Sequence, residues 1–235
     1  MKDVAPQIFA KCATLVSLLT LSPTASSVAL HEPRPRNPVL LIHGLADSEK
    51  SMELMKLRLK KAAWNAVSVS LVPSDGSAPL EQLAAQLANY IQIRFSPQQK
   101  IDIVAFSMGG VVARYYLQKL GGAARVERFV CISAPNHGSL LAYLSTKPGC
   151  RQMRPGSEFL TVLNRDFTGM QTVRCLSIWT PLDLTIIPAS SSRLETGISM
   201  RTWAVAHPLM ILQRGCFENI ARFLDDSATA TPKNP

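Results

Sequence analysis

A serine at position 107 stands between an apolar run and two glycines. Residues 100–106 read KIDIVAF and residues 108–113 read MGGVVA, which predicts a strand, a tight turn and then a helix. Such a turn pushes the serine hydroxyl out of the sheet, and only small residues fit two positions to either side. Ala105 and Gly109 occupy those positions. The pattern predicts that Ser107 is a nucleophile; the alternative is a serine that merely turns the chain.

A serine nucleophile needs a base that removes its proton and an acid that orients the base. When the serine lies between a strand and a helix in this way, the chain order is serine, then acid, then histidine. The chain has four histidines, His31, His43, His137 and His207. The first two precede the serine, and His137 precedes every suitable acid. His207 is therefore the predicted base, and the alternative is a histidine that caps a helix or fills the core.

The acid should follow the strand that precedes this histidine. Asp183 comes shortly after a predicted strand at residues 173–179, whereas Asp166 precedes that strand and Asp225 follows the histidine. Asp183 is therefore the predicted acid. The alternative is an ordinary turn residue, because aspartate is common in turns.

The negative charge that develops on the substrate oxygen needs preorganised N–H donors. The residue after the nucleophile supplies one, and a loop after an early strand supplies another. Here these are the backbone N–H groups of Met108 and Leu45, and Gly44 lets the backbone approach closely.

Strand-like and helix-like segments alternate from residue 38 onward. This order predicts an α/β fold with a mostly parallel sheet of about six strands and helices on both faces. The predicted strands are residues 38–42, 66–72, 100–106, 126–133, 173–179 and 200–206. The predicted helices are residues 49–64, a segment capped by Ser77 with Pro79 in its first turn, 108–120, 158–163 and 208–224, with a loop at 135–156.

Four segments carry a family resemblance: residues 40–45 (LLIHGL), 105–110 (AFSMGG), 134–139 (APNHGS) and 204–207 (AVAH). Together they resemble the small, lidless bacterial lipases of the α/β-hydrolase fold, of the Bacillus lipase A type. The alanine at position 105 is shared by these Bacillus-type members. The resemblance implies one catalytic domain over residues 38–224 with a minimal cap or none.

The same resemblance implies the chemistry. It implies hydrolysis of acylglycerols or other carboxylic esters through an acyl-serine intermediate, with no metal and no organic cofactor. Ser107 would be the nucleophile, His207 the base and then the acid, and Asp183 the residue that orients it. The amides of Leu45 and Met108 would form the oxyanion hole, and His137 would be structural.

Two features leave alternatives open. The segment 138–172 is longer than a minimal lipase needs, and its Leu140, Leu141, Tyr143 and Leu144 could cover the site as a small flap. Acyl transfer and thioester hydrolysis share the acyl-enzyme step with ester hydrolysis, so the same three residues serve either. A catalytically silent binding protein is disfavoured because no member of the set is missing.

The five cysteines show no CxxC pair and no metal-ligand spacing. Cys131 lies in an apolar run and is expected in the core. A bridge between Cys150 and Cys175 is conceivable if the chain is exported.

The chain carries a formal charge of +9. This balance favours acidic partners, and transient contact with an anionic lipid surface fits a lipid or small ester substrate. The densest basic stretch, residues 50–61, has apolar residues at helical spacing and is expected to be an ordinary solvated helix face. Nucleic acid is not an expected partner because no recognition motif accompanies the charge.

The first 29 residues stand apart from the rest. Two lysines precede an apolar run, and small residues end at Ala29, which resembles a secretory signal peptide; the alternative is an N-terminal extension. A signal peptide predicts a secreted or periplasmic protein, and the absence of a signal peptide predicts a cytoplasmic one. No run is long enough to span a bilayer. The polar residues 227–235 are expected to be a flexible tail.

Overall fold

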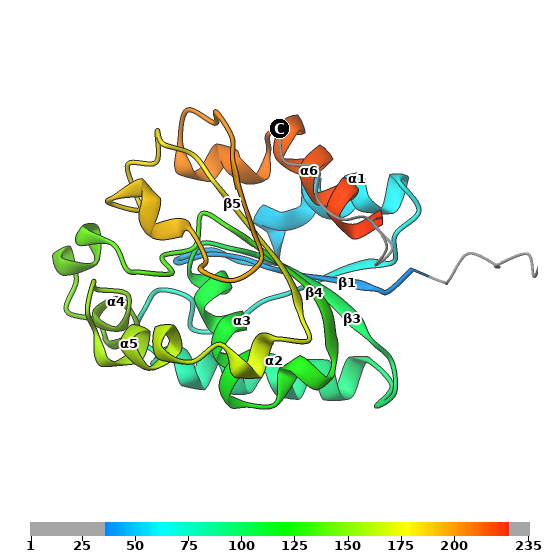
Figure 1. The fold of residues 1–235 in the computed structure, drawn as a ribbon, viewed down its shortest axis with the longest axis horizontal. Coiled ribbons are helices and arrows are strands. Elements are labelled where there is room, and N and C mark those ends of the chain that lie inside the picture. Colours follow the sequence, from blue (N-terminus) through cyan, green and yellow to red (C-terminus); the bar gives the residue numbers. More distant parts are fainter. Residues whose placement is uncertain (1–35, 226–235) are drawn as a thin grey trace, which may run out of the picture. The chain divides into compact units, whose positions relative to one another are not determined.

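A computed structural model describes residues 36–225, and these contain a single parallel sheet (Figure 1). Its six strands follow the order β2-β1-β3-β4-β5-β6. Every neighbouring pair is parallel. The strands are β1 (Val39–Ile42), β2 (Ala66–Val69), β3 (Ile101–Phe106), β4 (Val126–Ile132), β5 (Arg174–Trp179) and β6 (Ile198–Arg201). This confirms the predicted α/β-hydrolase architecture.

Helices cover both faces of the sheet (Figure 1). The α-helices are α1 (Glu53–Lys61), α2 (Leu80–Arg94), α3 (Met108–Lys119), α4 (Pro148–Gln152), α5 (Glu158–Arg165) and α6 (Arg214–Asp225). The 3-10 helices are η1 (Glu49–Met52), η2 (Gly122–Ala124), η3 (Leu140–Leu144), η4 (Thr168–Met170), η5 (Ala189–Ser192) and η6 (His207–Ile211).

The sheet separates two apolar cores because strand side chains alternate between its faces. In β1, Leu40 and Ile42 pack with the buried residues of α2 and α3. Val39 and Leu41 point the other way and pack with those of α1 and α6. All four side chains are fully buried, which explains why this strand reads as a continuous apolar run.

The basic stretch at residues 50–61 is a helix face, as predicted. Met52, Met55 and Leu59 are fully buried beneath it, and its cations lie on the outer side. The predicted single helix over 49–64 is shorter than expected, because it begins as η1 and α1 ends at Lys61.

The prediction that Ser77 caps α2 is wrong. The Ser77 amide and hydroxyl both donate to Asp75 Oδ1, at 3.0 and 2.6 Å, which makes a turn before the helix. The residue before the first helical turn is Pro79. The Leu80 amide instead donates to Gln152 Oε1 of α4 at 2.7 Å, so a residue distant in sequence satisfies the helix end.

Two other segments differ from their predicted boundaries. The expected loop at 135–156 contains η3 and α4. The expected helix at 208–224 is divided into η6 and α6, and the strand predicted at 200–206 ends at Arg201. Beyond it, Thr202 N donates to Trp179 O at 2.8 Å, and then the chain leaves the sheet.

The structure contains no bridge between Cys150 and Cys175. Both are free and buried, and Cys175 Sγ donates to the Val173 carbonyl at 3.4 Å. Burial raises the pKa of the Cys175 thiol to about 12. Cys131 is fully buried, which confirms its predicted place in the core.

The predicted signal segment at 1–29 and the tail at 227–235 lie outside the described residues. Within residues 36–225, no helix has the length and apolar character needed to cross a bilayer.

Candidate active site

Ser107 lies on a strained turn between β3 and α3. Its φ and ψ are 51° and −125°, a backbone conformation that non-glycine residues rarely adopt. Its amide donates to the Ile132 carbonyl of β4, and its carbonyl accepts from the Gly110 amide, both at 2.9 Å. These bonds hold the turn in place at the carboxyl end of β3.

The glycines around this turn are required by close packing. A Cβ at Gly109 would lie 2.3 Å from the His43 carbonyl oxygen, and one at Gly110 would lie 2.5 Å from Ala134 Cβ. Gly44 lies against Ser107 from the other side, because a Cβ there would be 3.1 Å from Ser107 Cβ. The glycines near Ser107, which indicated a nucleophile in the sequence, are therefore needed because a larger side chain would collide with its neighbours.

The predicted base and acid contact each other. His207 Nδ1 lies 2.8 Å from Asp183 Oδ2, although 24 residues separate them in the chain. Because the carboxylate accepts the Nδ1 proton, the ring keeps a lone pair on Nε2. Both side chains are almost fully buried, with exposed fractions of 8 % and 1 %.

Asp183 is fixed in its charged form by several donors. Burial alone would raise the pKa of its carboxyl. The hydrogen bond and charge of His207 and the amides of Ile186 and Thr185 outweigh burial, so the pKa lies below its ordinary value. Both amides donate to Oδ1 at 2.9 Å, which leaves Oδ2 for the histidine.

Phe106 connects this pair to the serine. Its ring and that of His207 have centroids 4.7 Å apart at an interplanar angle of 37°. Phe106 directly precedes Ser107, so the histidine packs beside the nucleophile turn. The described residues contain no hydrogen bond between the Ser107 hydroxyl and the ring. Such bonds are often long or poorly aligned before substrate binds.

The two predicted oxyanion donors, the N–H groups of Met108 and Leu45, donate no backbone hydrogen bond to another residue among residues 36–225. Met108 is the first residue of α3, where the helix provides no acceptor for the N–H group. No carbonyl accepts the Leu45 amide, whereas the next residue, Ala46, donates to Ser74 O at 2.7 Å. The Leu45 side chain is 40 % exposed.

Sequence reasoning excluded His43 as the catalytic base and assigned it no other role. In the structure its ring lies beneath the loop that carries Leu45. The ring is fully buried, Nδ1 lies 2.8 Å from the Gly44 carbonyl, and Leu71 N donates to Nε2 at 2.9 Å. These partners place the proton on Nδ1. In the sequence, only the adjacent Gly44 indicated that His43 supports the loop of the oxyanion donor.

Ser139 is a second residue that sequence reasoning missed. Its hydroxyl donates to the Thr185 carbonyl at 2.7 Å and accepts from the Ile187 amide at 3.0 Å. It therefore secures the loop that carries Asp183. No local pattern indicated this, because the partners are 46 and 48 residues away.

His137 lies apart from the Asp183–His207 pair. Its Nδ1 is 3.4 Å from Asn164 Nδ2, and its Nε2 is 4.0 Å from Glu195 Oε1. No group of three or more metal-ligating side chains is found in the described part of the chain.

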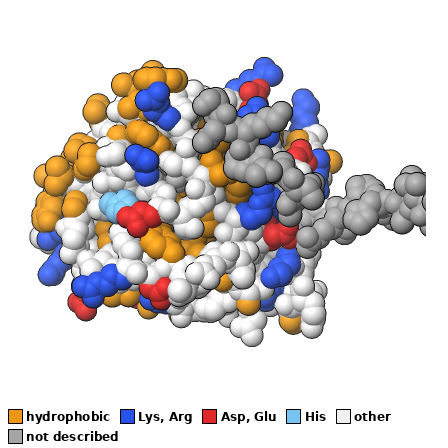
Figure 2. Space-filling model, in the orientation of Figure 1, with side chains coloured by type: hydrophobic (Ala, Val, Ile, Leu, Met, Phe, Trp, Pro, Cys, Tyr) orange, Lys and Arg blue, Asp and Glu red, His pale blue; other side chains and the backbone are white. Residues whose placement is uncertain are grey.

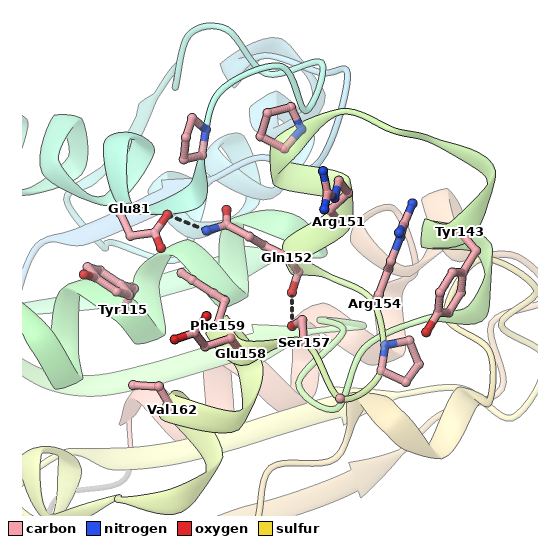
Figure 3. A pocket seen from close by; sticks show the side chains of 14 residues that line it. Glu81, Tyr115, Tyr143, Arg151, Gln152, Arg154, Ser157, Glu158, Phe159 and Val162 are labelled. Carbon is pink, nitrogen blue, oxygen red and sulfur yellow. Dashed lines mark hydrogen bonds between the residues drawn. The ribbon is translucent and has the colours of Figure 1, made fainter.

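A cavity of about 840 Å³ lies at α2, α3, α4 and α5, and none of the predicted site residues lines it (Figure 3). Its lining includes Glu81, Glu158, Arg151 and Arg154. In Figure 3, Gln152 donates to Glu81, and the Ser157 hydroxyl donates to the Gln152 carbonyl. The charges of both signs make it unsuitable for a fatty acyl chain.

A protein-family model described as palmitoyl protein thioesterase matches residues 38–193, which is more than half of the chain. The chain belongs to the palmitoyl protein thioesterase family. The matched range includes Ser107, Asp183 and both predicted oxyanion donors, and it ends before His207. At the level of fold and family, the prediction of an α/β-hydrolase is confirmed.

Solved structures share the fold of this palmitoyl protein thioesterase family member. The mature lipase BlEst2 of Bacillus licheniformis is 17 % identical with a TM-score of 0.64, and the match covers 83 % of this chain and 94 % of that one. Aspergillus fumigatus lipase B is 20 % identical with a TM-score of 0.65, and the match covers 75 % of this chain and 49 % of that one.

A curated relative is matched over a shorter region. The probable oxidoreductase EphD of Mycobacterium tuberculosis is 28 % identical over 137 residues, which are 55 % of this chain. The match spans only 23 % of that relative's length.

Proposed function

We propose that this family member hydrolyses acyl esters and thioesters with Ser107 as nucleophile, His207 as base and Asp183 as the residue that orients the base. The observation that carries the proposal is the 2.8 Å contact between His207 and Asp183. This pair packs on Phe106 beside the strained turn of Ser107. The roles follow from this arrangement, because it supplies a nucleophile, a base with a free Nε2 and a fixed carboxylate.

The proposed reaction has two stages. In the first, Ser107 Oγ attacks the acyl carbon while its proton moves to His207 Nε2, and the carbonyl oxygen becomes an oxyanion held by the Leu45 and Met108 amides. The bond to the leaving oxygen or sulfur then breaks, and the leaving group takes the proton from Nε2. In the second stage, water attacks the acyl-serine and gives a proton to Nε2; the bond to Oγ then breaks, and Nε2 returns the proton to Oγ, which releases the carboxylic acid and the free serine.

The family match favours thioesters of long-chain acyl groups as a second substrate class beside carboxylic esters. The same groups serve both, because the acyl-enzyme is common to the two reactions. A thiolate leaves more easily than an alkoxide, so a thioester depends less on proton donation by His207. Acyl transfer to an alcohol would follow if an alcohol replaced water in the second stage.

Active-site labelling tests the roles. A fluorophosphonate should add to Ser107 in the native protein, and the adduct should be found on the peptide that contains it. Ser107→Ala should remove labelling and lower p-nitrophenyl ester turnover by at least about 1,000-fold. Ser190→Ala is the matched control, because Ser190 is an exposed serine outside the proposed site. Undiminished turnover in Ser107→Ala would refute the proposal.

A substrate panel tests the bond that is cleaved. Esters and thioesters of equal acyl length, each with and without an added alcohol acceptor, separate ester hydrolysis, thioester hydrolysis and acyl transfer. We expect both hydrolysis rates to be lost together in Ser107→Ala, since one acyl-enzyme serves both.

Substrates with long acyl chains reside in or beside bilayers, so we also propose transient contact of the enzyme with an anionic lipid surface. Export with cleavage after Ala29 is a further proposal from the sequence. N-terminal sequencing of the protein recovered from cells tests it.

A further inference from the structure

Large apolar side chains stand exposed on the loops that follow β4, β5 and β6. The exposed fractions are 84 % for Leu144, 78 % for Leu184, 62 % for Trp203 and 70 % for Val205. The strands are parallel, so these loops leave the sheet at one edge, the edge at which Ser107 follows β3. Exposed apolar groups are common singly, but such a gathering indicates an interaction surface.

Hydrogen bonds make these loops neighbours. The start of η3 is tied to the Asp183 loop by Ser139 Oγ to Thr185 O at 2.7 Å and by Leu140 N to Ile187 O at 2.9 Å. The Asp183 loop is tied to the His207 loop by Thr180 Oγ1 to Ala204 O at 2.8 Å.

We name the exposed apolar side chains on these loops the apolar rim. Its members are Leu140, Leu144, Leu182, Leu184, Trp203 and Val205. Figure 2 shows hydrophobic side chains gathered at the end of the molecule toward which β1 runs in Figure 1.

The η3 helix is unusual because it buries little of its apolar surface. Its sequence is LLAYL, and none of its residues is buried. A surface helix of a globular protein normally buries its apolar stripe and shows polar groups to water, as α1 does with Met55 and Leu59. Only Ala142 packs, partly buried, against the core, and the four large side chains of η3 remain exposed to water.

Two of the three rim loops carry no acidic residue, and the single acid between the rim residues of the third, Asp183, is buried against His207. Residues 139–157 and 201–213 contain no aspartate or glutamate. Arg154 lies with its Cζ 4.8 Å from the centre of the Tyr143 ring, and Arg201 lies 5.1 Å from that of Trp203. Aromatic rings beside arginines are suited to the boundary between lipid and water, where one end is apolar and the other wet.

We propose that the apolar rim docks on an anionic lipid bilayer and thereby presents the Ser107 edge of the sheet to acyl chains in the membrane. Apolar insertion and attraction to acidic headgroups act together at such a surface. A second copy of the chain fits less well, because it would bring like-charged arginines together. The rim thus names the surface for the lipid contact proposed above, and its use in catalysis rests on the proposed function.

Vesicle flotation of the full chain tests the docking. The Ser107→Ala background prevents hydrolysis of the vesicles. We expect binding to vesicles of phosphatidylcholine mixed with phosphatidylserine and weaker binding to phosphatidylcholine alone. Leu144→Glu and Trp203→Glu should each lower binding by about tenfold or more, because each removes a large apolar group and adds a repelled charge.

Ile93→Glu is the matched control, because Ile93 is 78 % exposed on α2 and lies outside the rim. It should bind as the parent does. Equal loss in Ile93→Glu, full binding by the rim variants, or equal binding to both vesicle types would overturn the proposal. A dimer in sedimentation that Leu144→Glu dissociates, with no binding to vesicles, would also overturn it by assigning the rim to a second copy.

Fluorophosphonate labelling of the same rim variants in the Ser107 parent, without vesicles, separates the two proposals. Retained labelling with lost flotation supports the docking. Lost labelling in the parent itself counts against the proposed function and leaves the flotation result to decide the docking.

Discussion

The Nε2 atom of His43 accepts a hydrogen bond from the Leu71 amide at 2.9 Å, and the same ring lies 2.8 Å from the Gly44 carbonyl through Nδ1. One buried imidazole thus joins the end of β1 to the chain beyond β2. Leu45, a proposed oxyanion donor, follows directly, so the position of its amide depends on this ring.

We predict that His43→Ala lowers both stability and catalysis. The Leu71 amide would be left buried without an acceptor, which costs about 1–3 kcal/mol of unfolding free energy. The turnover number should fall further than the population of folded protein explains, because the Leu45 amide loses its support. Urea denaturation and ester kinetics on the same samples measure the two effects. His137→Ala is the control, since that ring is partly exposed; an equal fall in both variants would contradict the prediction.

Asp183→Asn should preserve the fold and lower turnover by about 10⁴-fold. An amide carries no charge, and it can present an N–H group to Nδ1, which forces the ring proton onto Nε2 and removes the base. Steady-state kinetics measure the fall, and circular dichroism checks the fold. Fluorophosphonate labelling should slow by a similar factor. Turnover within tenfold of the parent would show that another residue orients His207.

Gly109→Ala should destabilise the protein strongly. The added Cβ would meet the His43 carbonyl oxygen at 2.3 Å and Ile42 Cγ2 at 2.8 Å, so the helix must move away from β1. Overpacking of this kind costs about 1–3 kcal/mol or more. Gly215→Ala is the matched control, because nothing lies within 4 Å of its added Cβ. Thermal unfolding should show a lower midpoint for the first variant alone, and equal midpoints would contradict the packing argument.

Asp102 should make stability depend on pH at the amino end of the sheet. Burial raises the pKa of its carboxyl to about 6, against the opposing effects of the Arg128 guanidinium and of Asn37, while Glu127 adds to the rise. An unfolded aspartate titrates near 3.9. The folded state therefore favours the protonated form, and the contribution of this group to stability is lost as pH rises from about 4 to about 6.

As pH rises through this range, the unfolding free energy of the parent should fall relative to that of Asp102→Asn, because the variant has no carboxyl to titrate at this position. Urea denaturation at several pH values measures the difference between the two curves. Asp75→Asn is the control: the hydrogen bond from the Lys147 ammonium lowers the pKa of Asp75, so Asp75 contributes a slope only up to about pH 5, and its removal should leave the slope between about pH 5 and about pH 6 unchanged. A constant difference between Asp102→Asn and the parent would contradict the prediction.

Much of the fold was readable from the chain because its signals are local. Strands buried on both faces appear as short apolar runs, as at β1 and β3, and helix stripes recur at fixed spacing, as in α2. The turn at Ser107 was equally readable, since the strand, the small residues and the helix that make it lie within about a dozen positions of one another. Periodicity and steric need act between neighbours in sequence, so one chain is enough to show them.

The remaining features depend on residues that are distant in sequence. Only the folded chain brings His207 onto Asp183 and Phe106, closes the Ser139 contact to Thr185, and uses Gln152 in place of Ser77 at the start of α2. It also leaves Cys150 and Cys175 as free thiols and gathers the apolar rim from three loops. No spacing rule encodes such contacts, because each depends on where parallel strands place the ends of separate loops, and that is decided by the packing of the whole sheet and its helices.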